Sequence, residues 1–530
     1  MFSLASPIVG IMQLLMLRLS DRGKTMEIYT ASEMKEIDRI TINDDREKSF
    51  ELMKIASKGI FTIIDRKIKP NKKENILILA GKGNNGGDAL CVGNHLCEQG
   101  YKVSFAIVDE SDNLEKRSPQ MRFFEKELVK KQVAVLEAGA DDFYEAIKKS
   151  AWIIDGIFGA GFQGKATGFY KEVILALNGS HAKKIAIDLP SGLNGNNGLT
   201  DLAVCCDYTI VVDSYKTGLV FGDGPTYSGQ IHVTDPIGLA KEKPCYQKKE
   251  LLTEDEIPLL KKRKKTGHKY DFGKTIVVGG CKSMTGAPLL AGMAALKSGC
   301  GLSVVLNDEK TRAYTMNPWP ELIVESYQEE SDFLSHFDKC SCVVFGPGMG
   351  RNNSHSNLLL ALIKRNIPIV LDADGIELLN EIRDQISLEK AKVIITPHYG
   401  ELARLFRVKS TDVKKDPIYF AKSAAESYQV DVILKGAATI IVDSDSIKIH
   451  SGAESALATA GTGDVLSGIL AGLIAQGYSK KEALPLAVHL HFLAGCSAAE
   501  QKTSWSTTAG DVIDNLNVAI KEIVHRNGTR

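Results

Sequence analysis

The chain has 530 residues, 44% of them hydrophobic, with 65 Lys plus Arg balanced by 65 Asp plus Glu. A length well above about 300 residues exceeds what one hydrophobic core holds, so we expect several domains. The net charge of zero argues against nucleic acid or an anionic membrane as a partner. The 10 cysteines contain no CxxC pair or zinc-like spacing, which favours a reducing, cytoplasmic location.

The first 25 residues differ in character from the rest. Their apolar stretch LASPIVGIMQLLMLRL is shorter than the roughly 20 residues of a membrane span, and it lacks the basic start of a signal peptide. We expect residues 1–25 to be disordered or to derive from an upstream start codon. A weak amphipathic anchor is the alternative interpretation.

Residues 26–240 alternate between strand-like and helix-like segments. The strand-like runs are NILILA, VSFAIVD, WIIDGIF, KIAIDLP and YTIVVD. This alternation predicts a parallel sheet covered by helices on both faces, in a Rossmann-like three-layer α/β/α domain.

Glycine-rich loops follow several of these strands. The loop GKGNNGGD at 81–88 fits the G-x-G-x-x-G pattern of dinucleotide sites, although its asparagines and Asp88 suit a cation or a polar ring better. The loop GIFGAGFQGKATG at 156–168 nearly spells a P-loop. We reject that interpretation, because Ala166 stands where a magnesium-binding hydroxyl is required.

Three of these strand ends offer hard oxygen ligands, namely Asn85, Asp155 and Ser191. With nearby backbone carbonyls they suit a monovalent or alkaline-earth cation. The same residue types also serve ordinary βα turns, so the pattern alone leaves both interpretations open.

Residues 241–265 interrupt the alternation with a charged, proline-bearing segment that we interpret as a linker. Its cluster KKRKK suits solvated linker charge better than nucleic-acid binding. A second α/β series occupies 250–530, with the strand-like runs GKTIVVGG, GLSVVL, CVVFGPG, IPIVLDADG, KVIITPH, DVILKG and TIIVDSDSIKIH. Its last apolar helices must be buried.

The segment AGTGD leads directly into one of these apolar helices. The free amides of Gly461, Thr462 and Gly463 can bind an anion there, and Asp464 can take a proton from an attacking hydroxyl. An ordinary Asp N-cap is the alternative. Polar loops containing His398 and Lys435 also follow predicted strands, and the convergence of such loops favours a nucleotide and a second substrate.

The second series resembles the ADP/ATP-dependent NAD(P)H-hydrate dehydratases, relatives of ribokinase-like kinases, through FGPGMG, DADG, TPHYGE, LKGAATII and ATAGTGDVLSG. The resemblance implies a ribokinase-like α/β/α domain that uses ADP or ATP with Mg²⁺, with Asp464 as the base. It also implies a hydrate pocket and a nucleotide site, formed by Ala287, Gly348, Gly350, His398 and Asp464, and by Lys435, Gly436, Ala437, Ala438, Thr439, Gly461, Thr462 and Gly463.

The first series resembles the NAD(P)H-hydrate epimerase domain through GKGNNGGDAL, DGIFGAGFQG, IDLPSGLNG and DYTIVVDSYKTGL. The resemblance implies Asp188 as acid/base, and potassium bound by Asn85, Asp155 and Ser191. It implies hydrate contacts by Asn84, Asn85, Gly86, Gly87, Asp88, Gly159, Ala160, Gly161, Phe162, Gln163, Gly164, Lys165 and Asp188. Lys216 also matches a family position.

Taken together, the two resemblances predict one enzyme that repairs hydrated NADH and NADPH, and we expect a homo-oligomer without nucleic-acid or membrane partners. The rivals are a small-metabolite kinase and an epimerase-like domain that only binds. The sequence departs from the family pattern at four positions, which are Ala89, Ala160, Phe492 and Cys496.

Overall fold

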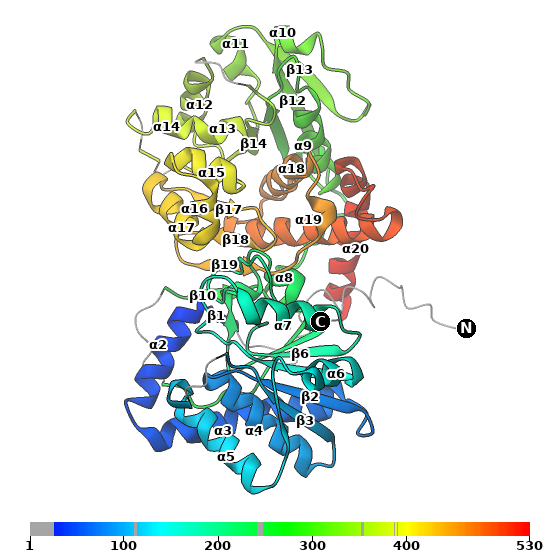
Figure 1. Cartoon of the computed structure of the whole chain (residues 1–530). Helices are drawn as coiled ribbons and strands as arrows, with labels where there is room; N and C mark the ends of the chain where they lie inside the picture. The colour runs from blue at the N-terminus through cyan, green and yellow to red at the C-terminus, as the bar shows by residue number, and fades with distance from the viewer. Residues whose placement is uncertain are drawn as a thin grey trace, which may run out of the picture. The chain divides into compact units, whose positions relative to one another are not determined.

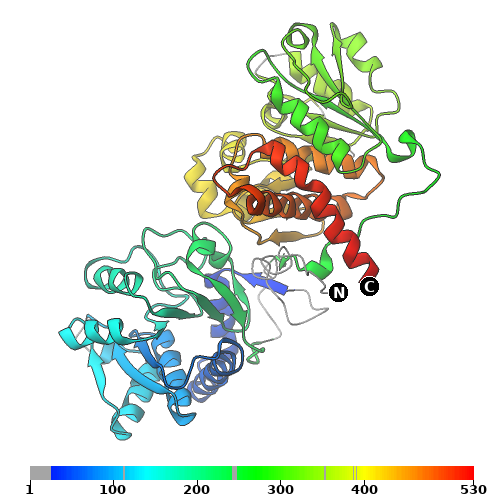
Figure 2. The same cartoon turned by 90° about the vertical axis from the view of Figure 1, so that its right-hand side faces the viewer.

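The protein is described by a computed structural model that covers residues 26–110, 114–240, 247–350, 354–385, 387–388 and 391–529. Contacts divide the chain into an N-terminal unit, Met26–Lys249, and a C-terminal unit that begins at Glu250 (Figures 1 and 2). The expectation for residues 1–25 falls outside the described residues, as does part of the expected linker, residues 241–246.

The N-terminal unit contains a parallel sheet with the strand order β4-β3-β2-β5-β6-β7-β9. Its strands are β2 (Asn75–Ala80), β3 (Lys102–Ile107), β4 (Val135–Glu137), β5 (Trp152–Gly156), β6 (Lys183–Ile187), β7 (Tyr208–Val211) and β9 (Gln230–Val233). A separate parallel pair joins β1 (Met26–Tyr29) to β8 (Tyr215–Lys216).

Helices cover both faces of this sheet. On one face α3 (Arg46–Ile63), α4 (Asn84–Glu98) and α5 (Pro119–Lys130) bury apolar side chains against β2 and β3. On the other face α6 (Asp141–Lys149) and α7 (Gly168–Asn178) do the same. The remaining helices are α2 (Ala31–Ile42), which begins with a Thr30 capping box, and the short α8 (Gly224–Tyr227).

The C-terminal unit contains a sheet with the strand order β13-β12-β11-β14-β15-β16-β17-β18-β19. Pairing is parallel from β13 to β17 and antiparallel from β17 to β19. The strands are β11 (Lys274–Val278), β12 (Leu302–Asp308), β13 (Ile323–Tyr327), β14 (Cys342–Phe345), β15 (Ile369–Leu371), β16 (Val393–Ile395), β17 (Asp431–Leu434), β18 (Thr439–Val442) and β19 (Ile447–His450); β10 (Lys249–Leu251) precedes them in sequence.

The last apolar helices of this unit are buried, as predicted, and they pack together with α9 (Gly286–Lys297) in one core cluster against the sheet (Figure 1). The apolar set is α9, α18 (Thr462–Ala475), α19 (Lys480–Lys502) and α20 (Ala509–Thr529). The other helices are α10 (Glu309–Arg312), α11 (Glu330–Ser335), α12 (Ser354–Lys364), α13 (Asp374–Glu377), α14 (Leu379–Ile382), α15 (Tyr399–Phe406), α16 (Ser410–Lys415) and α17 (Pro417–Tyr428).

The predicted two-domain α/β architecture is confirmed, with local differences in the strands, among them the short β4 and β9, which were not expected. The run TIIVDSDSIKIH was expected to be one strand, but it forms the antiparallel hairpin β18–β19. The carboxylate of Asp443 accepts hydrogen bonds from the amides of Asp445 and Ser446, and this side-chain turn reverses the chain. The sequence interpretation also missed β13.

None of the helices in the described ranges is long and apolar enough to cross a membrane. The apolar helices are instead packed together inside the C-terminal unit. A Cβ atom added at Gly468 of α18 would overlap the backbone oxygen of Ala291 on α9, so the close approach of these two helices requires glycine.

We therefore predict that Gly468→Ala destabilises the C-terminal unit by about 1–3 kcal/mol, because the added methyl group overpacks the contact between α9 and α18. Thermal and denaturant unfolding of the full chain measures the change. Gly510→Ala is the matched control, because the nearest atom to its added methyl group is 3.7 Å away. Equal stability of the two variants would contradict this account of the packing.

Candidate functional sites

A cavity of about 630 Å³ opens in the N-terminal unit. Its walls come from α2, α3, the start of α4 and the loops that follow β2, β5, β6 and β7. These loops lie together because the carboxyl ends of parallel strands meet at one edge of a sheet. The cavity is large enough for a small-molecule ligand.

Most residues predicted to contact the hydrate line this cavity, namely Asn84, Asn85, Asp88, Gly159, Ala160, Gly161, Phe162, Gln163 and Asp188. The described lining does not include Gly86, Gly87, Gly164 or Lys165. Lys165 instead forms an exposed ion pair with Asp201. A side chain at Gly86 would overlap the backbone of Gly81, so this glycine allows the loop to close on itself.

Asp188 and Lys216 form an ion pair on the cavity wall. The Lys216 ammonium donates to Asp188 Oδ1 and also, at 2.9 Å, to the carbonyl of Val212. The amide of Val212 donates back to Asp188 Oδ1 at 3.3 Å. Asp188 has a φ of 65°, an unusual value for a residue with a side chain, and such strain is common at functional sites.

Asn85, Asp155 and Ser191 also meet, around the backbone of Phe158. The Ser191 hydroxyl donates to Asp155 Oδ1 at 2.5 Å and accepts from the Phe158 amide at 2.8 Å, while Asn85 Nδ2 donates to the Phe158 carbonyl at 2.9 Å. Burial raises the pKa of Asp155 to about 6, although Ser191 opposes the shift. A buried carboxylate, a hydroxyl, an amide side chain and a carbonyl in one place fit a monovalent cation.

Among the cavity residues that the sequence interpretation missed is a carboxylate, Asp38 on α2. It lies on the side of the helix that also carries Met34, Ile37 and Thr41, and a carboxylate at this spacing on an apolar face was the available signal. Burial raises the pKa of Asp38 to about 6, and Lys216 opposes that shift.

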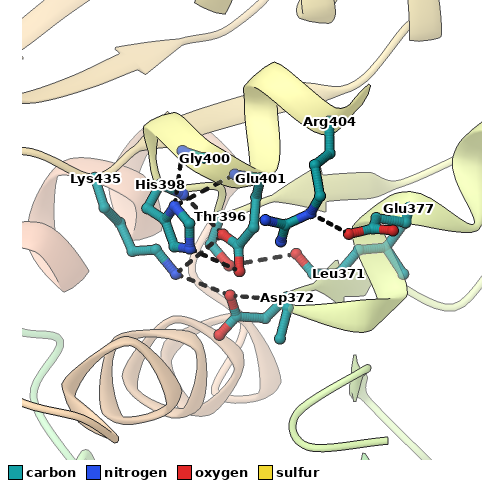
Figure 3. A network of polar contacts seen from close by, with 10 residues as sticks. Leu371, Asp372, Glu377, Thr396, His398, Gly400, Glu401, Arg404 and Lys435 are labelled. Carbon is teal, nitrogen blue, oxygen red and sulfur yellow. Dashed lines mark hydrogen bonds and ion pairs between the residues drawn. The ribbon is translucent and has the colours of Figure 1, made fainter. Parts of the chain in front are cut away.

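In the C-terminal unit, Lys435 lies among several carboxyl groups (Figure 3). Its ammonium is 2.9 Å from Asp372 Oδ1 and 4.0 Å from Glu401 Oε2. Burial alone lowers the pKa of Lys435, but Asp372 and Glu401 outweigh burial and raise it overall. The sequence motifs contained Asp372 and Glu401, but no role had been assigned to either residue.

His398 caps α15 beside this cluster. Its Nδ1 accepts from the Gly400 amide at 2.9 Å, while Glu401 Oε2 accepts from the His398 amide at 2.8 Å (Figure 3). Desolvation lowers the pKa of His398, so its ring is neutral at pH 7. Arg404 of the same helix pairs with Glu377. His398 and Lys435 follow the neighbouring strands β16 and β17, and an isolated parallel β-bridge holds these two residues next to one another.

Asp464 lies in the first turn of α18 and interacts electrostatically with the same charge cluster. Burial raises its pKa to about 8, Asp372 and Glu401 add to the rise, and Lys435 opposes it. Lys435 Nζ lies 3.0 Å from the position a Cβ atom would take at Gly463. The helix N-terminus and the ammonium thus approach one point, which suits an anion.

One detail of the predicted anion site differs in the structure. The amide of Thr462 donates to the Thr459 carbonyl at 3.3 Å, and its hydroxyl donates to the Leu457 carbonyl at 2.7 Å. Thr462 therefore anchors the loop in this state, and the amides of Gly461 and Gly463 remain the better placed donors. The sequence signal could not separate these roles, because a four-residue motif carries no information on the loop before it.

The predicted hydrate pocket residues lie on adjoining loops. A Cβ atom at Gly348 would be 3.1 Å from the Ala287 methyl group, and the Gly350 amide donates to Asp374 at 2.8 Å. Between the two aspartates of DADG, Ala373 has a φ of 48°. On one side of this strained residue the Asp372 carboxylate accepts a hydrogen bond from Lys435, and on the other side the Asp374 carboxylate accepts one from the Gly350 amide.

The predicted nucleotide-binding segment Lys435–Thr439 connects β17 to β18. Gly436 and Ala437 are exposed, whereas the Ala438 side chain is buried. A side chain at Gly436 would overlap the Tyr399 hydroxyl, so the backbone passes close to α15. An exposed backbone turn beside Lys435 is suited to binding a ligand through main-chain atoms.

Both units match known protein families. Residues 49–218 match a family described as YjeF-related protein N-terminus, and residues 275–517 match one described as NAD(P)H-hydrate dehydratase. The chain is 31% identical over 520 residues to a protein of Moorella thermoacetica named bifunctional NAD(P)H-hydrate repair enzyme Nnr, and the alignment covers 94% of this chain and 97% of that protein.

A protein of Coxiella burnetii with the same name is 30% identical over 499 residues, with 93% of this chain and 99% of that protein covered. Among solved structures, an ADP/ATP-dependent NAD(P)H-hydrate dehydratase from Bacillus subtilis, co-crystallised with ATP/Mg²⁺, is 26% identical. It covers 50% of this chain and 95% of its own length, with a TM-score of 0.45.

We predict that Lys435→Met lowers the free energy of unfolding by about 3–5 kcal/mol, because it leaves buried carboxylates without their cation. Adding Asp372→Asn to this variant removes one of these charges and should restore part of the loss. Denaturant unfolding measures both variants. Lys481→Met, which breaks an exposed pair with Asp445, should leave the free energy of unfolding almost unchanged, because water screens such a pair. A loss from Lys435→Met no larger than this control would contradict the prediction.

Proposed function

The chain belongs to the family of bifunctional NAD(P)H-hydrate repair enzymes, and we propose that it restores hydrated NADH and NADPH with one active site in each unit. The observation that carries the proposal is the match to enzymes of that name along nearly their whole length. We place the epimerase at residues 26–240 and the dehydratase from residue 250 onward. The two steps belong together, because a dehydratase specific for one epimer would leave the other epimer unrepaired.

In the first unit we place the hydrate in the cavity beside Asp188 and Lys216, with Asp188 as an acid/base of epimerisation. The loops that contain Asn84, Asn85 and Gly159 to Gln163 line the same cavity and would hold the nicotinamide ring. Asn85, Asp155 and Ser191 would hold a potassium ion, which would supply fixed positive charge next to these loops. The hydrogen bonds that link Asn85 and Ser191 to the Phe158 backbone, and Ser191 to Asp155, support this assignment.

In the second unit Asp464 takes the proton of the ring hydroxyl, whose oxygen attacks the terminal phosphorus of ADP or ATP. The leaving nucleotide is AMP or ADP. Phosphate then departs from the ring, and a neighbouring carbon loses a proton to restore NADH or NADPH. Lys435 and the amides of Gly461 and Gly463 would neutralise charge that develops on the transferred phosphoryl group.

Mg²⁺ would accompany the nucleotide in this unit. The described residues contain no group of three or more His, Cys, Asp or Glu that could hold a metal ion. Mg²⁺ is usually bound through substrate phosphates with one or two carboxylates and water. Asp372 and Glu401 are the carboxylates beside the proposed phosphate position. His398, Ala287, Gly348 and Gly350 would bind the hydrate.

We predict that Asp464→Asn lowers dehydration about 10²–10⁴-fold and that Asp188→Asn lowers epimerisation by a similar factor, because each removes a proton-transfer group. The assay mixes R and S hydrates of NADH with Mg²⁺, K⁺ and ADP or ATP, and follows NADH absorbance. Asp464→Asn should abolish recovery, and Asp188→Asn should limit it to the S fraction. A stable phosphoester product in place of NADH would contradict the proposal and indicate a small-metabolite kinase.

The pH dependence of dehydration offers a separate test. Because only ionised Asp464 accepts a proton and its pKa is about 8, kcat/KM should rise with pH and level off above about 8. Asp372→Asn removes a negative charge that raises the pKa of Asp464, so this limb, the rise of kcat/KM with pH, should move to lower pH. Asp445→Asn changes an exposed carboxylate on the β18–β19 turn and should leave the limb in place. A limb that does not move in Asp372→Asn would contradict the assignment of Asp464.

A further inference from the structure

The cavity of the N-terminal unit contains more carboxyl groups than the proposed reaction uses so far. Asp38, Asp88, Asp188 and Asp213 line it together with one interior lysine, Lys216. Lys216 is buried and ion-paired with Asp188. The lysines at 35 and 82, which also line the cavity, are exposed. Three of these four carboxyl groups therefore have no buried cation of their own. One of the three, Asp213, accepts hydrogen bonds from the Ser214 hydroxyl and the Ile237 amide instead.

Of the other two groups, Asp88 is half-buried at the start of a helix. It comes from the first turns of α4, and its Oδ1 accepts a hydrogen bond from the Ser57 hydroxyl at 3.2 Å. No cation pairs with it among the described residues. A carboxyl group that is enclosed by protein, borders a ligand cavity and lacks a cation is held in its protonated form.

Asp38 differs from Asp88 in its environment. It is likewise half-buried, but it comes from a different helix, and none of the hydrogen bonds among the described residues involves its carboxyl group. It interacts electrostatically with both Asp88 and Asp188. Asp38 is therefore a partly exposed carboxyl group of the cavity wall that interacts electrostatically with both of the other carboxyl groups.

We propose that Asp88 is the proton donor that works with Asp188 in epimerisation, and that Asp38 returns the proton between turnovers. This inference rests on the proposed function of the N-terminal unit. An epimerase needs both an acid and a base, because a bond to the inverted carbon must break and form again. Asp188, paired with Lys216, supplies only the base.

The proton and electron movements balance as follows. Asp88 gives its proton to the ring hydroxyl, the C–O bond breaks, water leaves, and the ring nitrogen lone pair forms a C=N bond. Water then adds to the other face of that carbon, the C=N electrons return to nitrogen, and the surplus proton passes to Asp188. The proton has moved from Asp88 to Asp188, and Asp38 carries it back. Nothing is oxidised or reduced.

The pH behaviour of the cavity agrees with these roles. Burial raises the pKa of Asp88 to about 8, so Asp88 is mainly protonated at pH 7, and the Ser57 hydrogen bond opposes the shift. The pKa of Asp38, raised by burial to about 6, suits exchange with water. The titratable groups that face these two carboxyl groups are Cys91, Asp188, Asp213 and Lys216.

The test uses the full chain and pure R hydrate of NADH, with epimer ratios measured directly by chromatography. We expect Asp88→Asn to slow epimerisation at least about 100-fold while the dehydration of S hydrate is unchanged. The wild-type rate should fall above about pH 8 as Asp88 ionises. Ser57→Ala removes a hydrogen bond that lowers the pKa of Asp88, so it should move this limb to higher pH without removing the carboxyl group.

Asp38→Asn should also slow epimerisation, and formate should restore part of the rate because a small acid can replace an accessible relay. Glu36→Gln, an exposed position on the same helix, should behave like wild type. An Asp88→Asn variant that keeps the rate and its high-pH limb would overturn the role of Asp88, and an Asp38→Asn variant with an unchanged rate would overturn the relay. Wild-type protein without epimerisation would instead refute the proposed function.

Discussion

In each unit one lysine ammonium lies among several carboxylic side chains, near the edge of the sheet where the parallel strands end. Lys216 pairs with Asp188 in the N-terminal unit, and Lys435 pairs with Asp372 in the C-terminal unit. Neither ammonium neutralises all of the carboxyl groups around it. The carboxyl groups left over, Asp88 and Asp464, each have a pKa raised to about 8. In both units, burial raises the pKa of these carboxyl groups, and the single ammonium nearby does not offset the rise. The carboxyl groups can therefore exchange protons near neutral pH.

The parallel sheets explain how these groups come together. Asp188 follows β6, Asp372 follows β15 and Lys435 follows β17, so each charged residue lies just beyond the carboxyl end of a buried strand. Helix starts at the same edge add Asp88 on α4 and Asp464 on α18. Glycines at the closest approaches, such as Gly81 beside Ile157, let the loops come into contact without side chains between them. The fold therefore dictates which residues meet, and the chemistry follows from their types.

Much of this arrangement was predictable from the sequence. The alternating runs predicted the sheets, and the polar residues at strand ends, including Asn85, Asp155 and Ser191, meet because parallel strands end at one edge. Residues that reach a site from outside its sequence motifs could not be predicted. Asp38 reaches the cavity from α2, more than 40 residues before the first glycine loop. The Thr459–Thr462 hydrogen bond was hidden for a similar reason, because local sequence does not specify how a loop closes.

Phe492 and Cys496, which depart from the family pattern, belong to a helix that packs against the loop before Asp464. Phe492, where the family pattern has glycine, is buried with its ring 5.1 Å from that of His450, and Gly452 has no room for a side chain beside it. Its neighbour His491 contacts the backbone of Thr462, and burial lowers the pKa of His491 to about 4, which keeps its ring neutral.

Further along the same helix, a side chain at Gly495 would overlap Leu457, whose carbonyl accepts the Thr462 hydroxyl. Cys496, where the family pattern has aspartate, is also buried, and burial keeps its thiol protonated by raising its pKa. Helix α19 thus supports the back of the loop that carries Gly461 to Asp464. The position of the anion-binding amides therefore depends in part on the packing of this helix, whose His491 also interacts electrostatically with Lys435.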